Sequence, residues 1–509
     1  MASYGAVADY LLQDPWLVIW LAMATLAFAL LRSRRRGAPP PLPPGPRPLP
    51  IIGNLLMMGQ LTHRGLAAMS ARYGGLVHLR MGRVHVVVAS SPEHAREVLQ
   101  AHDGELSNRP ASIAIAYLTY GRADMAFSHY GHFWRQSTNL VRSIAAAVNA
   151  GDGDDGGSEA VVEIGELIFG LSKDVIFRAA FGTRGGGGGH GGELEILLQE
   201  FSRLFGAFNI GDFIPWLAWL DLNGLNGRLR AARAGLDDVI DRIIDEHVRD
   251  ATPAGDEDAD MVDDMLVFLD EGGRDESGGG GGDELQGTLR LTRDNIKGII
   301  MDFVFGGTET VASAIEWAMA ELLHSPTNLH RLQAELADVV GLNRHVTEDD
   351  LDKLPFLKSV AMETLRLHPP IPLLLHEAST DCVVGGYSIP KGSRVLVNVW
   401  SVGRDPAAWN GAGAGEFFPA RFMPGGEAEG VDLRGGCFEL LPFGSGRRAC
   451  PAVVLGLYEM ELVVARLVHA FDWAVPAGEV LDMGDGFGLT APRAVRLRAV
   501  PTPRLTCEM

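Results

Sequence analysis

The segment PFGSGRRACPAVVLGLYEM, from Pro442 to Met460, places one thiol between a loop of glycines and arginines and an apolar run with helical spacing. We expect a helix to begin near Pro451. That start would put the thiol of Cys450 beside unpaired helix N–H groups and the positive end of the helix dipole. Both favour the thiolate form of a cysteine.

The loop before this cysteine supplies small residues and cations. Gly444 and Gly446 would let backbone amides approach the sulfur, and Arg447 and Arg448 bring two positive charges near it. From these residues alone three interpretations remain open. The thiolate is a ligand for iron or another soft metal, as in an axial ligand to haem; the cysteine is a buried structural residue; or the arginines form a phosphate-binding loop.

Composition limits the classes of function. The chain has 509 residues, enough for one large domain or two to three smaller ones, and it is 47% hydrophobic. A net charge of −20 argues against a general nucleic-acid binder, which would present a basic face. The four cysteines are scattered and contain no Cys-x-x-Cys pair, so we expect neither a disulfide framework nor a zinc site. A reducing compartment follows.

The N-terminal region predicts a membrane anchor. WLVIWLAMATLAFALL, Trp16 to Leu31, has no charge, and RSRRR follows at Arg32 to Arg36. Sixteen residues rise roughly 24 Å as a helix, slightly less than the hydrocarbon core of a bilayer. Positive charge after the apolar run favours an uncleaved anchor with its C-terminal side in the cytosol, whereas a cleaved signal peptide carries its charges before the run. We therefore assign residues 1–36 to an anchor with a basic flank.

A proline-rich stretch follows the anchor. GAPPPLPPGPRPLPIIGN, from Gly37 to Asn54, cannot form a helix or a central strand. Such a run is stiff and extended. We expect residues 37–50 to be a hinge, either a plain linker or a spacer that sets the pose of residues 51–509 on the membrane.

The rest of the chain predicts a mainly α fold with a small β portion. GLVHLRMGRVHVVVAS, residues 75–90, alternates like a hairpin, and Ser91 followed by Pro92 marks a helix start. Residues 193–208, 228–248 and 294–325 carry apolar residues at helical steps. Strand character returns in residues 386–403.

The last of these helices contains an unfavourable run, FVFGGTET. Gly306 and Gly307 together cost a helix interior roughly 2 kcal/mol relative to alanine. Glu309 and Thr310 add a carboxylate and a hydroxyl among apolar neighbours. The pattern predicts a kinked helix with a groove for a flat ligand and a hydroxyl–acid pair that relays protons. The alternative is a glycine-mediated helix crossing.

A third pattern is METLRLHPPIP. Glu363 and Arg366 stand three residues apart on a helix and share a face, and Pro369 ends that helix. If the pair is buried it needs a further partner. Arg421, in FFPARF, is the candidate third member.

Taken together, the motifs resemble those of the cytochrome P450 monooxygenases. FGSGRRAC (Phe443 to Cys450) is similar to their haem-binding loop, GGTET to their oxygen-activation motif, and ETLR with FPARF to their Glu-Arg-Arg triad. The motif order also matches, and the resemblance covers essentially the whole chain. It implies a haem held between the long kinked helix and the cysteine loop, after one N-terminal transmembrane helix.

Longer runs resemble a plant subfamily, the ferulate/coniferaldehyde 5-hydroxylases. They include YLTYGRADMAFSHYGHFWRQ, LFGAFNIGDFIPW and HPPIPLLLHE. The resemblance implies hydroxylation of the aromatic 5-position of ferulate, coniferaldehyde or coniferyl alcohol in lignin and phenylpropanoid biosynthesis. Alternatives are a related plant hydroxylase acting on flavonoids or p-coumaroyl esters, and a haem-thiolate sensor that does no oxygenation, against which GGTET argues.

The same resemblance implies roles for individual residues. Cys450 would be the axial ligand of haem b, and Thr310 with Glu309 would manage protons. The other assignments fall into three groups: haem contacts (Phe443, Gly444, Arg448, His376, Trp134), substrate contacts (Ile115, Leu118, Phe305, Gly306, Leu373, Leu374, Thr490) and the structural triad (Glu363, Arg366, Arg421).

Partners and location follow from the same resemblance. Electrons would come from NADPH through a separate NADPH–cytochrome P450 reductase, with O2 and a small phenylpropanoid as substrates and no nucleic acid. The chain would be a single-pass protein of the endoplasmic reticulum membrane with its catalytic domain facing the cytosol.

Two departures from the family pattern stand out. Position 138 is Thr where the family usually has an Arg facing a propionate, and STNLVRSIAAAVNAGDGDDGGS stands in for a longer segment after Gln136. Losing packed helix there would favour an inactive or poorly haem-loaded homologue. Ala452 replaces a usual Gly, a mild change from which we expect little effect.

Overall fold

A computed structural model describes Met23 and residues 40–110, 112–118, 161–181, 191–207, 209–221, 224–250, 260–266, 269, 292–409 and 411–507. The expected transmembrane segment (Met23 apart), Trp134, Thr138 and the shortened segment after Gln136 lie outside these residues.

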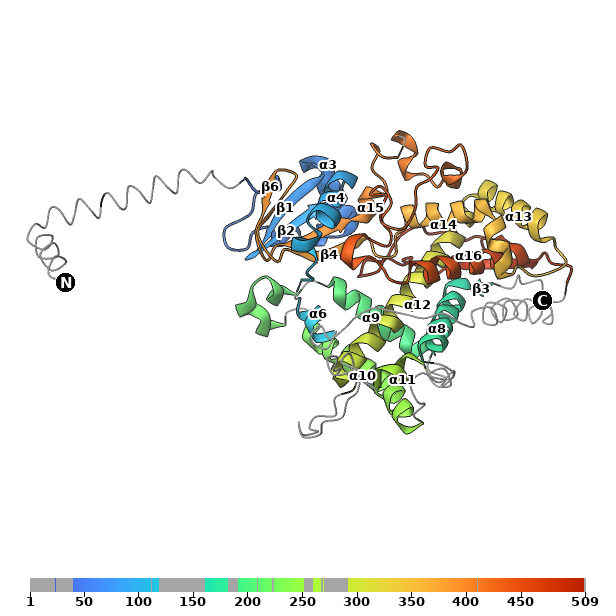
Figure 1. Cartoon of the computed structure of the whole chain (residues 1–509), viewed down its shortest axis with the longest axis horizontal. Helices are drawn as coiled ribbons and strands as arrows, with labels where there is room; N and C mark the ends of the chain where they lie inside the picture. Colours follow the sequence, from blue (N-terminus) through green and yellow to red (C-terminus); the bar gives the residue numbers. More distant parts are fainter. Residues whose placement is uncertain are drawn as a thin grey trace, which may run out of the picture.

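A four-stranded sheet forms one end of the molecule, drawn blue and orange in Figure 1. The expected hairpin is confirmed, because β1 and β2 pair antiparallel through six residue pairs. β2 then pairs parallel with β7, and β7 antiparallel with β4, so the N-terminal hairpin is completed by strands about 300 residues later in the chain. The strands and their flanking helices are β1 (Leu76–Met81), β2 (Val84–Ala89), β7 (Arg394–Asn398), β4 (Leu373–Glu377), α3 (His63–Tyr73) and α4 (Pro92–Arg96).

Two smaller sheets account for the other strands of the described residues. One has the order β3-β9-β8, and the other is the β5–β6 hairpin. Their bounds are β3 (Val162–Glu163), β8 (Phe471–Ala474), β9 (Arg498–Pro503), β5 (Cys382–Val384) and β6 (Tyr387–Ile389). The expectation of a minor sheet component is confirmed.

Helices form the rest of the fold, and α12 runs through their middle (Figure 1). It contacts α8, α10, α14 and α16, and most of its side chains are buried. Among the described residues α12 alone has the length and apolar composition of a membrane-spanning helix, and it is this core helix. The principal helices are α6 (Ile113–Leu118), α8 (Ile164–Phe181), α9 (Gly191–Gly206), α10 (Leu225–Arg249), α11 (Met261–Leu266), α12 (Arg293–His324), α13 (Pro326–Val340), α14 (Pro355–Leu367) and α16 (Val453–Ala470).

The glycine pair of α12 does not interrupt the helix. A capping box between Thr292 and Asn295 starts α12, which continues as α-helix to His324. A Cβ on Gly307 would lie 2.3 Å from Cδ1 of Ile176 on α8, whereas a Cβ on Gly306 would meet no atom within 4 Å. Gly307 therefore serves a close helix crossing, and Gly306 faces open space. The predicted kink does not take the form of a break in the helix.

The described part of the proline-rich hinge docks on the strand-rich end. Its backbone is extended, and the carbonyls of Pro41 and Pro44 accept hydrogen bonds from Ser388 and His78, at 2.9 Å each. A Cβ on Gly45 would overlap the carbonyl oxygen of His78. This stretch is fixed to the sheet and is not a free linker, so it can transmit an orientation to the domain.

Candidate active site

The cysteine loop folds back closely on itself. The N–H of Cys450 donates to the carbonyl of Phe443 at 2.9 Å. Gly444 and Gly446 have φ values of +71° and +70°, a region that favours glycine. A Cβ on Gly446 would also lie 2.5 Å from the carbonyl oxygen of Leu99. Both glycines are therefore required by the backbone path that positions the thiol.

The Cys450 thiol is partly buried and lies just before the helix start. α16 begins at Val453, with Ala452 as its N-cap, so the expected start near Pro451 is confirmed to within two residues. Burial raises the pKa of the Cys450 thiol, and the hydrogen bond from the N–H of Ala452 opposes that effect. Burial of the thiol therefore opposes the thiolate form that the helix start favours, and a bound cation would stabilise that form. Ala452 has φ −97°, which alanine adopts without strain.

The face of α12 that carries Gly306 presents a hydroxyl to open space. The Oγ1 of Thr310 donates to the carbonyl of Gly306 at 2.6 Å, and both residues are partly or fully exposed. Glu309, the next residue, is 2% exposed. Phe305 is buried and its ring lies 4.9 Å from that of Phe201. The helix therefore offers one glycine surface and one hydroxyl oxygen at this face.

Four elements meet around the same space. The position of a Cβ on Gly444 lies 3.6 Å from Cδ1 of Leu374 on β4, and that of Gly456 on α16 lies 3.7 Å from Val311 on α12 and 4.0 Å from Phe443. Apolar side chains here, Leu374, Val311 and Phe443, stay partly exposed within the fold. The walls are apolar, one side is a glycine surface, and a soft thiol lies on the cysteine loop. This donor set fits haem b with an axial thiolate.

Positive groups gather at one edge of this space. Nδ1 of His376 lies 2.8 Å from the carbonyl of Leu106, and Nε of Arg448 donates to the carbonyl of Ser107 at 3.0 Å. The pKa of His376 is lowered to about 4, first by burial and then by the charges of Arg109 and Arg448. The neutral ring donates through Nδ1, so Nε2 carries no proton. Nε2 can donate to a carboxylate only when it is protonated as well, which the negative charge of that carboxylate favours.

Arg109 is a member of this edge that sequence reasoning missed. Its guanidinium hydrogen-bonds the carbonyl of Leu375, beside His376. The only sequence signal was a cation before Pro110 in a stretch without helical or strand periodicity. The contact joins residues separated by 266 positions, so no local pattern could have indicated it.

The predicted structural Glu-Arg-Arg triad forms in the core. Glu363 accepts from Arg366 at 2.7 and 2.8 Å and from Arg421 at 3.1 Å, and all three side chains are at most 2% exposed. The N–H of Phe418 adds a further bond to Glu363 at 2.7 Å. Two cations and one carboxylate are thus satisfied together, which a buried ion pair requires.

The seven predicted substrate residues separate into two groups. Ile115, Gly306, Leu373 and Leu374 are at least partly exposed, and Phe305 lies beside Gly306. Leu118 and Thr490 have 0% exposure. The Thr490 hydroxyl hydrogen-bonds that of Ser202 at 2.7 Å. Direct contact with a ligand would require these last two to become exposed, so they support the wall from behind.

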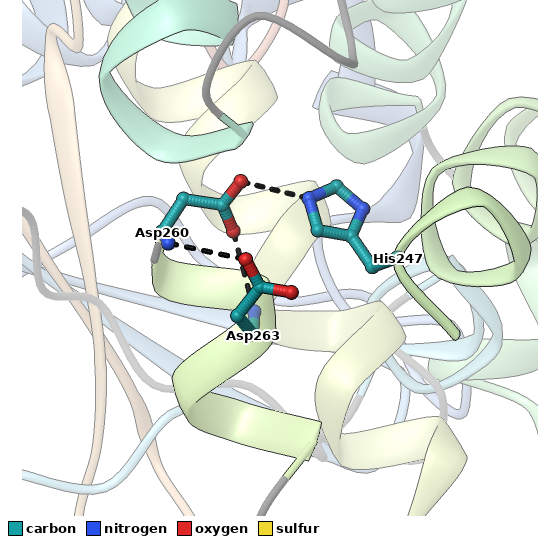
Figure 2. A group of neighbouring side chains, drawn as sticks. All are labelled: His247, Asp260 and Asp263. Carbon is teal, nitrogen blue, oxygen red and sulfur yellow. Dashed lines mark hydrogen bonds and ion pairs between the residues drawn. The ribbon is translucent and has the colours of Figure 1, made fainter. Parts of the chain in front are cut away.

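A second cluster of possible metal ligands lies between α10 and α11 (Figure 2). Ring nitrogens of His247 lie 2.6 Å from the carbonyl of Ile243 and 2.8 Å from Oδ2 of Asp260. Burial lowers the pKa of His247, but these bonds and the charges of Asp260 and Asp263 outweigh it and raise the pKa. Asp260 also accepts from the N–H groups that start α11. A ring that donates from both nitrogens has no lone pair for a metal, so the cluster ties two helices together.

Comparison with protein families and curated proteins gives concordant matches. The model of the cytochrome P450 family matches residues 43–149 and 137–495. Cytochrome P450 84A1 of Arabidopsis thaliana is 50% identical, with 98% of each chain covered. Flavonoid 3′-monooxygenase CYP75B137 of Crocosmia x crocosmiiflora is 38% identical over 96% of this chain and 97% of its own. The first alignment spans 531 positions against 509 residues here, so that relative carries residues this chain lacks.

Solved structures agree with the fold. A zebrafish cytochrome P450 bound to abiraterone superposes with a TM-score of 0.63 at 28% identity, covering 87% of this chain and 99% of that one. A second zebrafish structure, with progesterone, gives a TM-score of 0.64 at 27% identity.

Proposed function

This chain belongs to the cytochrome P450 family, and from that premise we propose that it hydroxylates the aromatic 5-position of guaiacyl phenylpropanoids. As a family member it is a monooxygenase that uses haem with a cysteine thiolate ligand and takes electrons from a redox partner. The observation that carries the proposal is the open face of α12 at Gly306. A Cβ placed there would meet no atom within 4 Å, and the surrounding residues are apolar. Such walls suit a flat phenylpropanoid ring. The choice of ferulate, coniferaldehyde or coniferyl alcohol, and of lignin biosynthesis, rests on the long runs shared with plant 5-hydroxylases.

The protein's own residues would hold the haem. Cys450 would supply the sulfur ligand, and the two positive-φ glycines and Phe443 shape the loop that presents it. Arg448 and Arg109 would offer charge to carboxylates at the edge, and His376 and Trp134 would be further contacts. Haem supplies the activation of O2 that protein side chains lack.

Thr310 and Glu309 would handle protons at this face. The Thr310 hydrogen now points at the Gly306 carbonyl at 2.6 Å, so the hydroxyl oxygen retains lone pairs toward the open space. Because its proton is held by a backbone oxygen of the same helix, the hydroxyl keeps one orientation. Buried Glu309 provides an acid one residue away. Ile115, Phe305, Gly306, Leu373 and Leu374 then orient the ring, with Leu118 and Thr490 behind them.

Turnover with a purified reductase tests the substrate. We expect NADPH-dependent formation of 5-hydroxyconiferaldehyde from coniferaldehyde and little hydroxylation of naringenin. Preference for naringenin or a p-coumaroyl ester would favour the second candidate. The relatives named flavonoid 3′-monooxygenase, at 38% identity, are the observation behind that alternative.

The shortened region after Gln136 motivates the third candidate, an inactive or poorly haem-loaded homologue. The family match divides at residues 137–149, the stretch where the sequence is shorter than expected. A CO-difference spectrum of the reduced, membrane-expressed protein separates the cases. A thiolate-type Soret band supports the hydroxylase, and its absence supports the inactive homologue.

We further propose that residues 1–36 anchor the protein in the endoplasmic reticulum membrane, with residues 37–50 as hinge and residues 51–509 in the cytosol, where NADPH–cytochrome P450 reductase can dock. Exposed apolar side chains support this pose: Trp216 and Trp219 are 69% and 77% exposed, and Ile51 and Leu56 84% and 78%. Their neighbours Leu55 and Ile214 share one buried cluster, so the two segments lie together beside the docked hinge. Deleting residues 1–36 should release the protein from membranes only when the two tryptophans are also replaced by serine.

A further inference from the structure

A second cavity of about 440 Å³ lies away from the proposed haem space. Its wall includes Glu321 of α12, eleven residues after Thr310 and therefore about 16 Å farther along the helix. Small organic ligands occupy cavities of this size. The cavity plays no part in the oxygenation proposed above, so its lining needs a separate explanation.

Arg404, which lines the cavity, is a partly buried cation. Nη1 of Arg404 is buried and has no hydrogen-bond partner among the described residues, and no ion pair there involves Arg404. The guanidinium lies over the ring of Trp400, 4.1 Å from its centroid, and the buried Nε1 of Trp400 also lacks a partner in the same part of the chain. Burial, and then the charges of Arg366 and Arg64, lower the pKa of Arg404 to about 9, so it remains charged at neutral pH. Leaving such donors unsatisfied is costly.

Two other charged residues of the lining, Arg64 and Glu321, already have partners. Arg64 forms two bonds to one oxygen of Asp485, at 2.9 and 2.6 Å. Glu321 binds His368 at 2.6 Å, and that ring stacks on Trp317 with centroids 3.8 Å apart. Of the two arginines lining the cavity, Arg404 alone forms no ion pair among the described residues.

Apolar groups complete the wall. Phe417, Met483 and Leu367 line the same cavity, and exposed Glu416 lies at its surface. One free guanidinium matches a single negative charge, and a carboxylate can bind it through two oxygens. A phosphate dianion would meet the same single cation together with the charges of Glu321 and Glu416, which disfavours it.

We propose that this cavity binds a small amphipathic carboxylate, whose carboxylate group is bound by Arg404 and whose apolar body lies against Phe417 and Met483. The site is separate from the haem space, so the ligand is an effector or passenger and not the molecule being hydroxylated. The proposal does not depend on which substrate the enzyme hydroxylates.

Calorimetric titration of the haem-loaded protein with benzoate tests the proposal. We expect one saturable site in wild type and at least about tenfold weaker binding in Arg404→Gln, the usual loss for a charge-assisted hydrogen bond. Benzamide and inorganic phosphate should bind at least about tenfold more weakly than benzoate. Arg434→Gln, at an exposed arginine elsewhere, should behave as wild type. No saturable benzoate binding, tighter phosphate binding, or equal affinity in Arg404→Gln would overturn the proposal.

Two further variants test the proposal even if Arg404→Gln fails to fold. Glu416→Gln removes an exposed acid whose backbone carbonyl still binds Arg366, and it should tighten benzoate binding by about two- to fivefold. Met483→Trp fills the cavity without changing its charge and should weaken binding while leaving the Soret band unchanged. Unchanged affinity in both variants would contradict the proposal. Crystals with 4-bromobenzoate should show an anomalous peak beside Arg404, and a peak only in the haem space would also contradict it.

Discussion

Arg366 and Arg448 use the same side chain in opposite ways. The guanidinium of Arg366 is fully buried and donates to Glu363 and to the carbonyls of Gly403, Ala414 and Glu416. Arg448 is exposed and donates to one carbonyl, that of Ser107, among the described residues. An arginine that supports the fold has its donors used internally, whereas one kept for a ligand retains free donors.

The difference separates two regions. Around Glu363 each charge is satisfied, so that region is complete without a ligand. Around Cys450 a partly buried thiol, a glycine surface and partly exposed apolar walls are left, so that region needs a bound group to be complete. Substitutions in the two regions should therefore have different effects.

The largest effect is expected from Cys450→Ser, in the region that needs a bound group. An alcohol is a much poorer ligand for the iron than a thiolate, so the thiolate-type band in the CO-difference spectrum should vanish and hydroxylation should fall to background. Cys437→Ser, at another partly buried thiol near the loop, should retain the band. A thiolate-type band in Cys450→Ser would reject this cysteine as the ligand.

In the region around Glu363, where each charge is satisfied, Glu363→Ala leaves Arg366 and Arg421 as buried cations without their carboxylate. We expect the free energy of unfolding to fall by roughly 3–5 kcal/mol, as when one partner of a buried ion pair is removed. Urea unfolding followed by circular dichroism measures it. Glu200→Ala, which breaks the exposed pair with Arg228, should cost no more than about 1 kcal/mol. Equal losses in the two variants would remove the distinction between the regions.

The sequence could predict the features that repeat at short spacing. The hairpin followed from alternation through residues 76–89, and the contact of Glu363 with Arg366 from their three-residue spacing. The need for small residues in the cysteine loop was also visible in the sequence, and Gly444 and Gly446 both have positive φ. In each case the interacting atoms are separated by a few residues or one strand length, so local geometry determines the contact.

Features that depend on long-range packing could not be predicted. Gly306 and Gly307 look alike in sequence, but only the fold brings Ile176 against one of them. Arg109 reaches the site through a contact across 266 positions. The hydroxyl of Thr490 is bonded to Ser202, 288 positions away, a contact that no local pattern indicates. The orphan donors of Arg404 and Trp400 are visible only when their neighbours are in place.

A buried acid of α16 extends the comparison to pH. Glu459 is as buried as Glu363, yet its hydrogen-bond partner is the hydroxyl of Ser172 and not a pair of arginines. Burial raises the pKa of Glu459 to about 8, and the bond from Ser172 opposes that rise only in part. The folded state therefore binds an extra proton between the unfolded value of 4.5 and about 8.

The sign of the effect follows directly. The stabilisation is fully present below pH 4.5 and is lost as the pH rises through about 8. Between pH 5 and 8 wild type should lose on the order of 3 kcal/mol of unfolding free energy relative to Glu459→Gln, whose amide does not titrate. Urea unfolding across this range measures the difference. Parallel pH profiles would mean that this carboxyl is not held neutral.

The smallest effect compares two threonines that make the same hydrogen bond. Thr310 and Thr364 each donate to the carbonyl four residues earlier, at 2.6 and 2.8 Å. Thr364 is fully buried in α14, whereas Thr310 lies at the open face of α12. If the exposed hydroxyl manages protons, Thr310→Ala should keep NADPH consumption but lower product per NADPH by about tenfold, with peroxide released instead.

Thr364→Ala removes the same bond and should change stability but not this ratio. Thr310→Ser, which keeps the hydroxyl, should recover most of the coupling. An equal product-to-NADPH ratio in Thr310→Ala and Thr364→Ala would show that Thr310 serves only its helix. In that case the open face of α12 would differ from the buried triad in shape and not in chemistry, because its hydroxyl would make the same internal bond and nothing more.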